Sequence, residues 1–298
     1  MQILTWNVQW CCGLDGVVSP QRIVQHALSM GADHGALDVL CLQEVAVGHD
    51  GLQGAPGDQV AQLRALLPGW QLCFAATTEG FDAQGRYRAF GNLVATRLPV
   101  AEVAQHRLPW RAETGVVSMP RGCLVVTVRD PALGLVRVMT THLEYHSAHQ
   151  RRDQVQALRR LHAEALAQCA ALPGTAGAAT PYATPVHTPH AVLCGDFNLE
   201  PHEAEYAQLV AAAVPGEAAF HDSWSLLHPG DQQPDTFRLF DRTWGPEPGA
   251  GAGGLRFCAG QRQPARGRAR LAHGQCHPVF GSPAGVHRAG LNTTPQGA

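Results

Sequence analysis

Residues 191–198 read AVLCGDFN, a short apolar run that leads into Gly195, Asp196 and Asn198. An apolar run of this length, bounded by turn-forming residues, predicts a buried strand. Residues 37–44, LDVLCLQE, have the same form and end in Glu44. The two stretches predict buried strands that deliver polar side chains to the rim of a sheet.

Two further candidate strands end in a polar side chain. Residues 2–7, QILTWN, end in Asn7, and residues 134–142, GLVRVMTTH, end in His142. Val- and Thr-rich runs bounded by Gly or Pro predict more strands, and apolar positions three and four apart predict helices. The remaining predicted strands are 70–77, 90–100 and 122–130, with a hairpin over 122–141, and the predicted helices are 20–34, 58–67 and 150–171. This mixture predicts an α/β fold in which sheets pack on each other and helices lie outside.

The polar strand ends suit one kind of chemistry. Glu44 and Asp196 are hard oxygen ligands of the kind that Mg²⁺ prefers. Asn7 and Asn198 can orient a phosphate or a water without adding charge, and His142 can donate a hydrogen bond to a developing oxyanion. Each residue alone is more often an ordinary turn or loop residue. Together they form the inventory of metal-assisted phosphoryl chemistry.

The order of these motifs resembles the endonuclease/exonuclease/phosphatase superfamily of DNase I-like phosphoesterases. The matching stretches are TWNVQ with Asn7, LQE with Glu44, FGNLVATRLPV with Gly91 and Asn92, THLE with His142, and GDFN with Asp196 and Asn198. The resemblance covers about residues 1–245 and implies a domain over 1–247. The implied fold is a four-layer α/β/β/α sandwich of two sheets with helices on the outer faces.

The resemblance also implies roles for these residues. Glu44 binds Mg²⁺, or Mn²⁺ in its place, and Asn7 supports that metal. Asp196 and Asn198 position the nucleophile, the phosphate or a second metal. His142 contacts the phosphate and Asn92 contributes to substrate binding. The implied reaction is in-line attack of water on a phosphoester, in a nucleic acid or in a small molecule.

The charges divide the chain into a body, residues 1–247, and a tail, residues 248–298. All 22 basic residues are arginine, and the 24 acidic residues end at Glu247. The tail holds six arginines and no acid, which gives +6, and the body holds 16 arginines and 24 acids, which gives −8. The superfamily pattern requires an Asp-containing strand and then an S-D-H-x-P-V motif near this end, and the tail can supply neither carboxylate.

A reading-frame shift accounts for the missing motifs. One base forward from Leu255, permitted codons give Cys-Asp-Phe, and the same shift over residues 277–289 permits Ser-Asp-His-Gln-Pro-Val. We therefore expect a frameshifted or disordered tail, missing last strands and impaired activity. The alternative is a natural basic tail that contacts nucleic acid.

Other interpretations stay open at this stage. His142, His146 and His149 have a spacing that could bind zinc, and a non-catalytic phosphate-binding protein is a second functional class. A DNA-repair nuclease is disfavoured because the acidic body lacks the basic surface that DNA binding requires. The sequence shows no signal peptide and no membrane span, and its nine cysteines suit reduced thiols in the cytoplasm. No protein partner is predicted.

Overall fold

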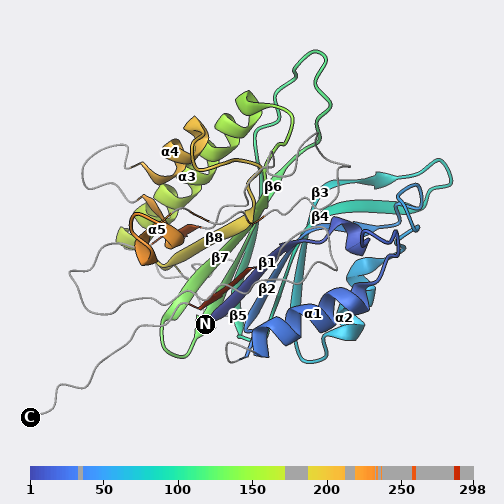
Figure 1. Ribbon diagram of the computed structural model, residues 1–298, viewed down its shortest axis with the longest axis horizontal. Coiled ribbons are helices and arrows are strands. Elements are labelled where there is room, and N and C mark those ends of the chain that lie inside the picture. Colours follow the sequence, from blue (N-terminus) through green and yellow to red (C-terminus); the bar gives the residue numbers. More distant parts are fainter. Residues whose placement is uncertain are drawn as a thin grey trace, which may run out of the picture.

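Two β-sheets pack against each other in the computed structural model of the chain, with helices on both outer sides (Figure 1). The structure describes residues 1–32, 36–171, 187–211 and 219–231, positions 233 and 236, and the backbone of 257–259 and 285–288. The first sheet contains β1 (Gln2–Asn7), β2 (Val39–Val47), β3 (Gln71–Phe81), β4 (Tyr87–Thr96) and β11 (Gly285–Arg288), in the order β11-β1-β2-β4-β3.

The second sheet has the order β5-β6-β7-β8-β10-β9. Its strands are β5 (Val100–Arg107), β6 (Gly122–Asp130), β7 (Gly134–His142), β8 (Ala191–Asp196), β9 (Phe220–Asp222) and β10 (Phe257–Ala259). The helices are α1 (Pro20–Ala32), α2 (Gln59–Leu66), α3 (Ala148–Ala170), α4 (Ala204–Val210) and α5 (Ser223–Leu227), with a 3-10 turn η1 (Gln9–Cys11).

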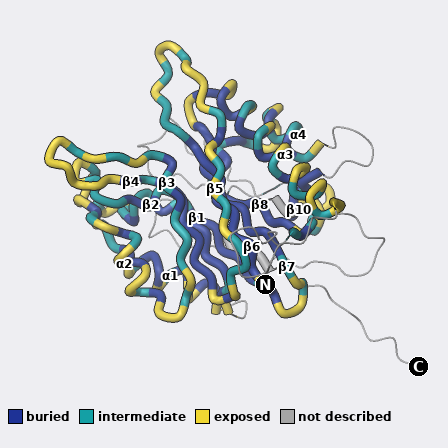
Figure 2. The backbone as a smooth tube through the Cα atoms, turned by 180° about the vertical axis from the view of Figure 1, so that it is seen from behind, coloured by how far each residue is buried: buried dark blue, intermediate teal, exposed yellow. Residues whose placement is uncertain are grey.

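Three apolar layers hold the four structural layers together, as the predicted α/β/β/α sandwich requires. One layer packs the outer face of the first sheet on α1 and α2, and includes Trp6, Ile23 and Leu63. Another packs the second sheet on α3 and α4. The third joins the inner faces of the two sheets. Figure 2 shows this burial as dark strands in the middle of the molecule and exposed backbone in the peripheral loops.

Strand direction brings the predicted polar residues to one rim. β1 pairs with β2 in parallel, and β7 pairs with β8 in parallel, each pair connected by a crossover helix, α1 or α3. Parallel partners end at the same edge of their sheet. Asn7, His142 and Asp196 end their strands, whereas β2 continues past the predicted end at Glu44 to Val47. All four side chains nevertheless reach one region of the rim.

Some predicted boundaries differ from the observed ones. The predicted strand 90–100 is two strands, because β4 ends at Thr96 and β5 begins at Val100 after Pro99, which lacks a backbone N–H. The predicted helix 150–171 begins at Ala148, where the side chain of Ser147 accepts a hydrogen bond from the Gln150 N–H. The short elements α4, α5 and β9 were not predicted.

The expectation that the last strands are missing is corrected at two places. β10 lies between β8 and β9 and pairs antiparallel with both, over Phe257–Ala259. β11 pairs antiparallel with β1 over Gly285–Arg288. These segments form strands because pairing uses the backbone, which any sequence other than proline provides. The rest of the predicted tail lies outside the described residues.

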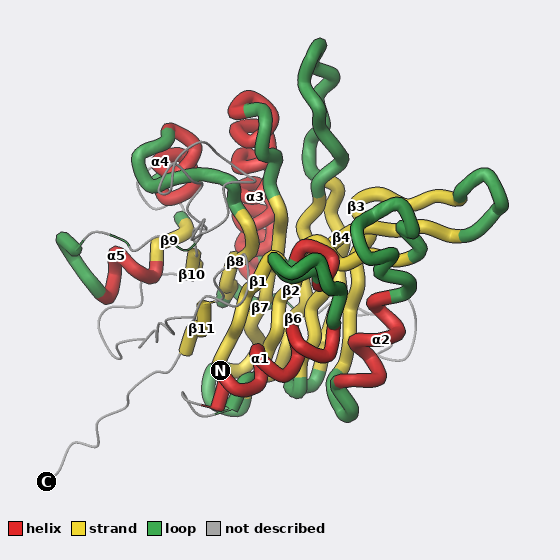
Figure 3. The backbone as a smooth tube through the Cα atoms, turned by 45° about the vertical axis from the view of Figure 1, so that its right-hand side comes forward, coloured by secondary structure: helices red, strands yellow, loops and turns green. Residues whose placement is uncertain are grey.

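No helix in the part of the chain that the structure describes is long and apolar enough to cross a membrane. Beyond the sheets extend the β3–β4 hairpin and the loop that joins β5 to β6, as Figure 3 shows.

Candidate active site

Glu44 reaches the rim through an irregularity in β2. The pairing of β2 with β4 shifts register between Leu42 and Val45, and Glu44 has a φ of 61°. A bulge of this kind redirects a side chain that a regular strand would place in the pleat. The preceding Gln43 fixes the bulge, because its buried Nε2 donates to Thr140 Oγ1 of the second sheet at 2.9 Å.

Asn7 joins the two candidate metal-binding carboxylates. Its Nδ2 donates to Glu44 Oε1 and to Asp196 Oδ2, both at 2.8 Å. Its Oδ1 accepts from the Gln9 backbone N–H at 3.1 Å, which fixes the orientation of the amide. Residues that are 37 and 189 positions apart from Asn7 in the chain thus meet at one group. In this arrangement Asn7 orients the carboxylates, and its role as a metal ligand stays a prediction.

The GDFN stretch forms a tight turn at the end of β8. Gly195 has a φ of 136°, and a Cβ at this position would overlap the backbone carbonyl of Thr141 in β7. Asp196 Oδ1 accepts the backbone N–H of Asn198 at 3.1 Å, and Asn198 Nδ2 donates to the Leu143 carbonyl at 2.9 Å. Asn198 is therefore tied to the chain segment that follows β7, and its backbone N–H holds the Asp196 carboxylate in the same turn.

His142 lies beside both carboxylates. Its Nδ1 is 3.8 Å from Glu44 Oε1, and its Nε2 is 3.7 Å from Asp196 Oδ2. These distances exceed hydrogen-bond length, so the ring nitrogens remain available to a ligand. Burial, together with the positive charge of Arg121, lowers the pKa of His142 to about 3 against a smaller opposing effect of Asp196. The imidazole is neutral at physiological pH and can donate one hydrogen bond.

The pKa of the Glu44 carboxyl is shifted well above its usual range. Burial raises its pKa to about 7; the Asn7 hydrogen bond and the charge of Arg121 lower it, and the negative charge of Asp196 raises it further. A carboxyl in this state lacks a strong cationic partner in the protein. An added divalent cation would supply that partner and favour the ionised form.

Asn92, the predicted substrate-binding residue, lies in β4 and is buried. Its Nδ2 donates to the Gly122 carbonyl at 3.2 Å, which links β4 of the first sheet to β6 of the second. The structure therefore brings Asn92 to the junction of the sheets, and its role toward substrate stays a prediction.

Sequence reasoning missed Arg121 and assigned no role to Glu144, although Glu144 belongs to the quoted THLE motif. The Arg121 guanidinium Nε lies 3.5 Å from Glu144 Oε2, and both side chains are buried. Arg121 also acts electrostatically on Glu44 and His142. The signal that could have indicated it is an arginine immediately before a continuous apolar strand, in a position where a charge is expensive.

The donor chemistry of the rim fits Mg²⁺ better than zinc. Mg²⁺ keeps several waters and commonly takes one or two protein carboxylates together with substrate phosphate oxygens, which matches Glu44 and Asp196. In the described ranges there is no group of three or more His, Cys, Asp and Glu side chains able to hold a metal ion. The zinc interpretation of His142, His146 and His149 is therefore not borne out.

The sequence and the fold both lead to one family. The chain belongs to the endonuclease/exonuclease/phosphatase family, whose model matches residues 4–258, and members of this family are phosphoester hydrolases. No curated protein matches the sequence significantly.

Solved structures share the fold. An endonuclease/exonuclease/phosphatase from Beutenbergia cavernae is 21% identical with a TM-score of 0.66, covering 97% of this chain and 72% of that one. A mannosyl-6-phosphatase from Bacteroides thetaiotaomicron is 15% identical with a TM-score of 0.61, covering 98% and 100%. The human nocturnin catalytic domain, solved with a bound sulfate, is 16% identical with a TM-score of 0.58, covering 98% and 93%.

Proposed function

We propose that this protein is a Mg²⁺-dependent phosphoesterase that hydrolyses a phosphodiester or phosphomonoester bond by in-line attack of water. The observation that carries the proposal is the convergence of Glu44 and Asp196 on one amide, at 2.8 Å each, with His142 less than 4 Å from both. Mg²⁺, or Mn²⁺ in its place, would be held by Glu44 and would stabilise negative charge on the phosphate.

The protein side chains divide the remaining work. Asp196 is held by Asn7 and by the Asn198 N–H, so that its carboxylate can orient the attacking water. Asn198 keeps that carboxylate in place, and the neutral His142 donates a hydrogen bond to a phosphate oxygen as charge develops. Asn92 contributes to the substrate side of the rim. The substrate is a nucleic acid or a small phosphoester, and the cytoplasm is the proposed location.

The cellular location rests on the cysteines. The seven cysteines of the described ranges are all free thiols, which suits a reducing compartment.

Hydrolysis of bis-p-nitrophenyl phosphate and p-nitrophenyl phosphate tests the proposal. We expect Mg²⁺-dependent turnover that EDTA abolishes and added Mg²⁺ restores. Glu44→Gln should abolish it, whereas the control Glu79→Gln, on the β3–β4 hairpin where the Glu79 carboxylate accepts a hydrogen bond from the Tyr87 hydroxyl, should not. Turnover that persists in Glu44→Gln or in EDTA would contradict the proposal.

A second candidate is a protein that binds phosphate without hydrolysing it. One observation favours it: after Glu247 the sequence contains no carboxylate, although the catalytic histidine of this kind of enzyme is normally oriented by one. Phosphate binding to the wild-type chain, without turnover of either nitrophenyl ester, would identify this second function.

A further inference from the structure

Arg121 occupies a junction between the two sheets. It directly precedes β6, and its carbonyl accepts the Leu108 N–H at 3.0 Å. The next carbonyl along, that of Gly122, accepts from Asn92 Nδ2 at 3.2 Å and from Thr141 Oγ1 at 3.0 Å. The backbone of Arg121 is therefore fixed between the strand that carries Asn92 and the strand that ends in His142.

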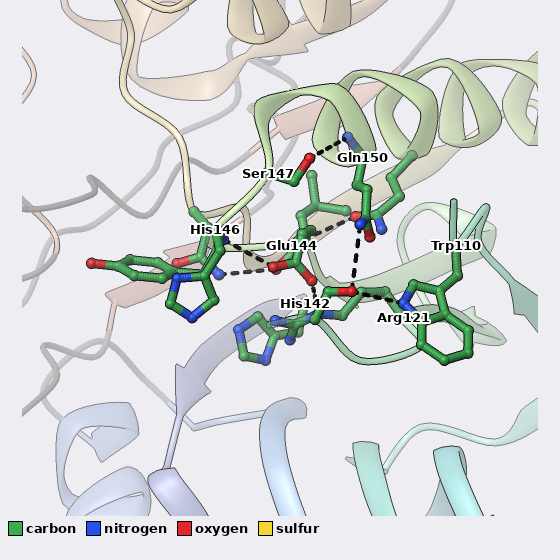
Figure 4. Close-up of polar contacts among 12 residues, drawn as sticks. Trp110, Arg121, His142, Glu144, His146, Ser147 and Gln150 are labelled. Carbon is green, nitrogen blue, oxygen red and sulfur yellow. Dashed lines mark hydrogen bonds and ion pairs between the residues drawn. The ribbon is translucent and has the colours of Figure 1, made fainter. Parts of the chain in front are cut away.

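Glu144 holds the side chain of Arg121 and is itself firmly held. The Glu144 side chain is fully buried, and its Oε2 lies 3.5 Å from Arg121 Nε. Its Oε1 accepts the His146 N–H and its own N–H donates to Gln154 Oε1, each at 2.9 Å. In Figure 4 the side chains of Arg121 and His142 both lie below this carboxylate. The guanidinium is thus preorganised next to a predicted phosphate-contacting residue.

The two Nη atoms form the far end of the Arg121 guanidinium. Within the described ranges, no group accepts a hydrogen bond from its two Nη atoms, although the side chain is only 8% exposed. Two other buried arginines differ in this respect. Arg137 uses Nη2 with His162 Nδ1 at 2.8 Å, and Arg151 uses both Nη atoms with carbonyls and with Glu203.

This difference in hydrogen bonding distinguishes an arginine that only stabilises the fold from one whose donors can bind a ligand. A guanidinium carries five N–H donors in a planar fork. The Arg121 Nη atoms are not among the fully buried side-chain atoms that lack a hydrogen bond, so they border accessible space that a ligand can enter. The fork matches two oxygens of a phosphate group, which it can bind bidentately. Arg137 and Arg151 engage Nη atoms inside the protein, although Arg151 Nε is buried without a partner. In the described ranges both Nη atoms of Arg121 lack a protein acceptor.

We propose that Arg121 binds the non-bridging oxygens of the substrate phosphate through its Nη groups, and that Glu144 is the residue that positions it. The inference rests on the proposed function for the identity of the substrate. The ligand chemistry itself, an anion with paired oxygens, follows from the donors of Arg121. Glu144 lies on the far side of the guanidinium and acts through Arg121 without touching the phosphate.

Binding of inorganic phosphate to the full-length protein with Mg²⁺, measured by calorimetry, tests the proposal without requiring turnover. Arg121→Ala should weaken phosphate affinity roughly 10- to 100-fold, as expected for lost charge-assisted hydrogen bonds. Millimolar guanidinium ion should restore part of that affinity by filling the vacated space. Arg137→Ala is the matched control, because Arg137 is equally buried and lies near the opposite end of β7; it should keep its phosphate affinity.

Two more variants separate the effect of the planar guanidinium fork and its position from the effect of the positive charge. Arg121→Lys keeps the ion pair with Glu144 but lacks the fork, so it should fold and still bind phosphate at least several-fold more weakly. Glu144→Gln keeps Arg121 but loosens it, and should weaken phosphate binding less than Arg121→Ala does.

The outcomes separate this inference from the proposed function. Unchanged phosphate affinity in Arg121→Lys and Arg121→Ala would overturn it, even if the wild-type chain hydrolyses phosphoesters. A loss that guanidinium does not restore, accompanied by a lower melting temperature, would assign Arg121 a structural role only. A wild-type chain that binds phosphate through Arg121 but has no turnover would retain this inference and refute the hydrolase proposal.

Discussion

Replacing Gly195 by alanine should test whether the turn after β8 sets the geometry of the site. The residue has a φ of 136°, and its added Cβ would overlap the Thr141 carbonyl, a backbone atom that cannot rotate away. β7 and β8 would have to separate next to the paired residues His142 and Asp196. A positive φ costs about 1–2 kcal/mol for a non-glycine residue, and the backbone clash should bring the total loss to about 3–5 kcal/mol.

Gly69→Ala is the matched control for the backbone strain. Gly69 has a φ of 81°, and nothing lies within 4 Å of the position its Cβ would take. Its substitution should cost only the conformational strain, about 1–2 kcal/mol. Urea unfolding of the two variants gives the difference in free energy of unfolding. Equal losses in Gly195→Ala and Gly69→Ala would refute the clash, and with it the close approach of β7 and β8 at the site.

Two further predictions concern stability away from the site. Burial, with a smaller effect of Arg137, lowers the pKa of His162 to about 4. The unfolded chain therefore binds the proton more tightly than the folded chain does. The free energy of unfolding should fall by up to about 3 kcal/mol as the pH drops from about 6.5 to about 4. Urea unfolding across that range should show a shallower pH dependence in His162→Gln, and an unchanged slope would contradict the assignment. Ser147→Ala should cost about 1–2 kcal/mol, because Ser147 Oγ caps α3 at Gln150 and also donates to Glu113; thermal unfolding that matches the wild type would show that the cap contributes nothing.

The sequence predicts the site best where an apolar, buried run leads directly into a polar residue. The apolar runs before Glu44 and Asp196 predict both strands, since a continuous apolar run favours a buried strand. Asp196 ends β8 as predicted, whereas β2 continues past Glu44 to Val47. The bulge that turns Glu44 outward has no such signal, because it depends on pairing with β4, which is distant in the sequence. β5 was missed because its alternating pattern is half exposed, and its extent is set by contact with β6.

The role of Arg121 needed the structure for a different reason. An arginine before a strand is ordinary in a sequence. It is distinguished here by its burial beside Glu144 and by Nη groups that no acceptor in the described part of the chain engages. Hydrogen-bond satisfaction is a property of the folded environment, and residue type does not reveal it. The same limit applies to Asn7, whose predicted metal role and observed contact with two carboxylates require different amide orientations.

The last prediction concerns the tail, where strand pairing and chemistry make separate demands. β10 connects β9 to β8, and β11 covers the edge of β1; these contacts use backbone groups, which exist in either reading frame. The missing Asp and Asp-His motifs require particular side chains, which the sequence after Glu247 lacks.

We therefore expect a version ending at residue 247 to melt at a lower temperature and to aggregate, because the edges of β1 and β8 become unpaired. A version with the shifted frame should pair both strands and raise turnover by roughly 10²- to 10⁴-fold, the usual contribution of acid–base groups. Both expectations are tested by melting curves and nitrophenyl phosphoester turnover of the truncated, the given and the frame-shifted chains. An unchanged melting temperature on truncation would show that β10 and β11 do not contribute to stability. Equal turnover of the given and the frame-shifted chains would show that Glu44, His142 and Asp196 catalyse the reaction without those motifs.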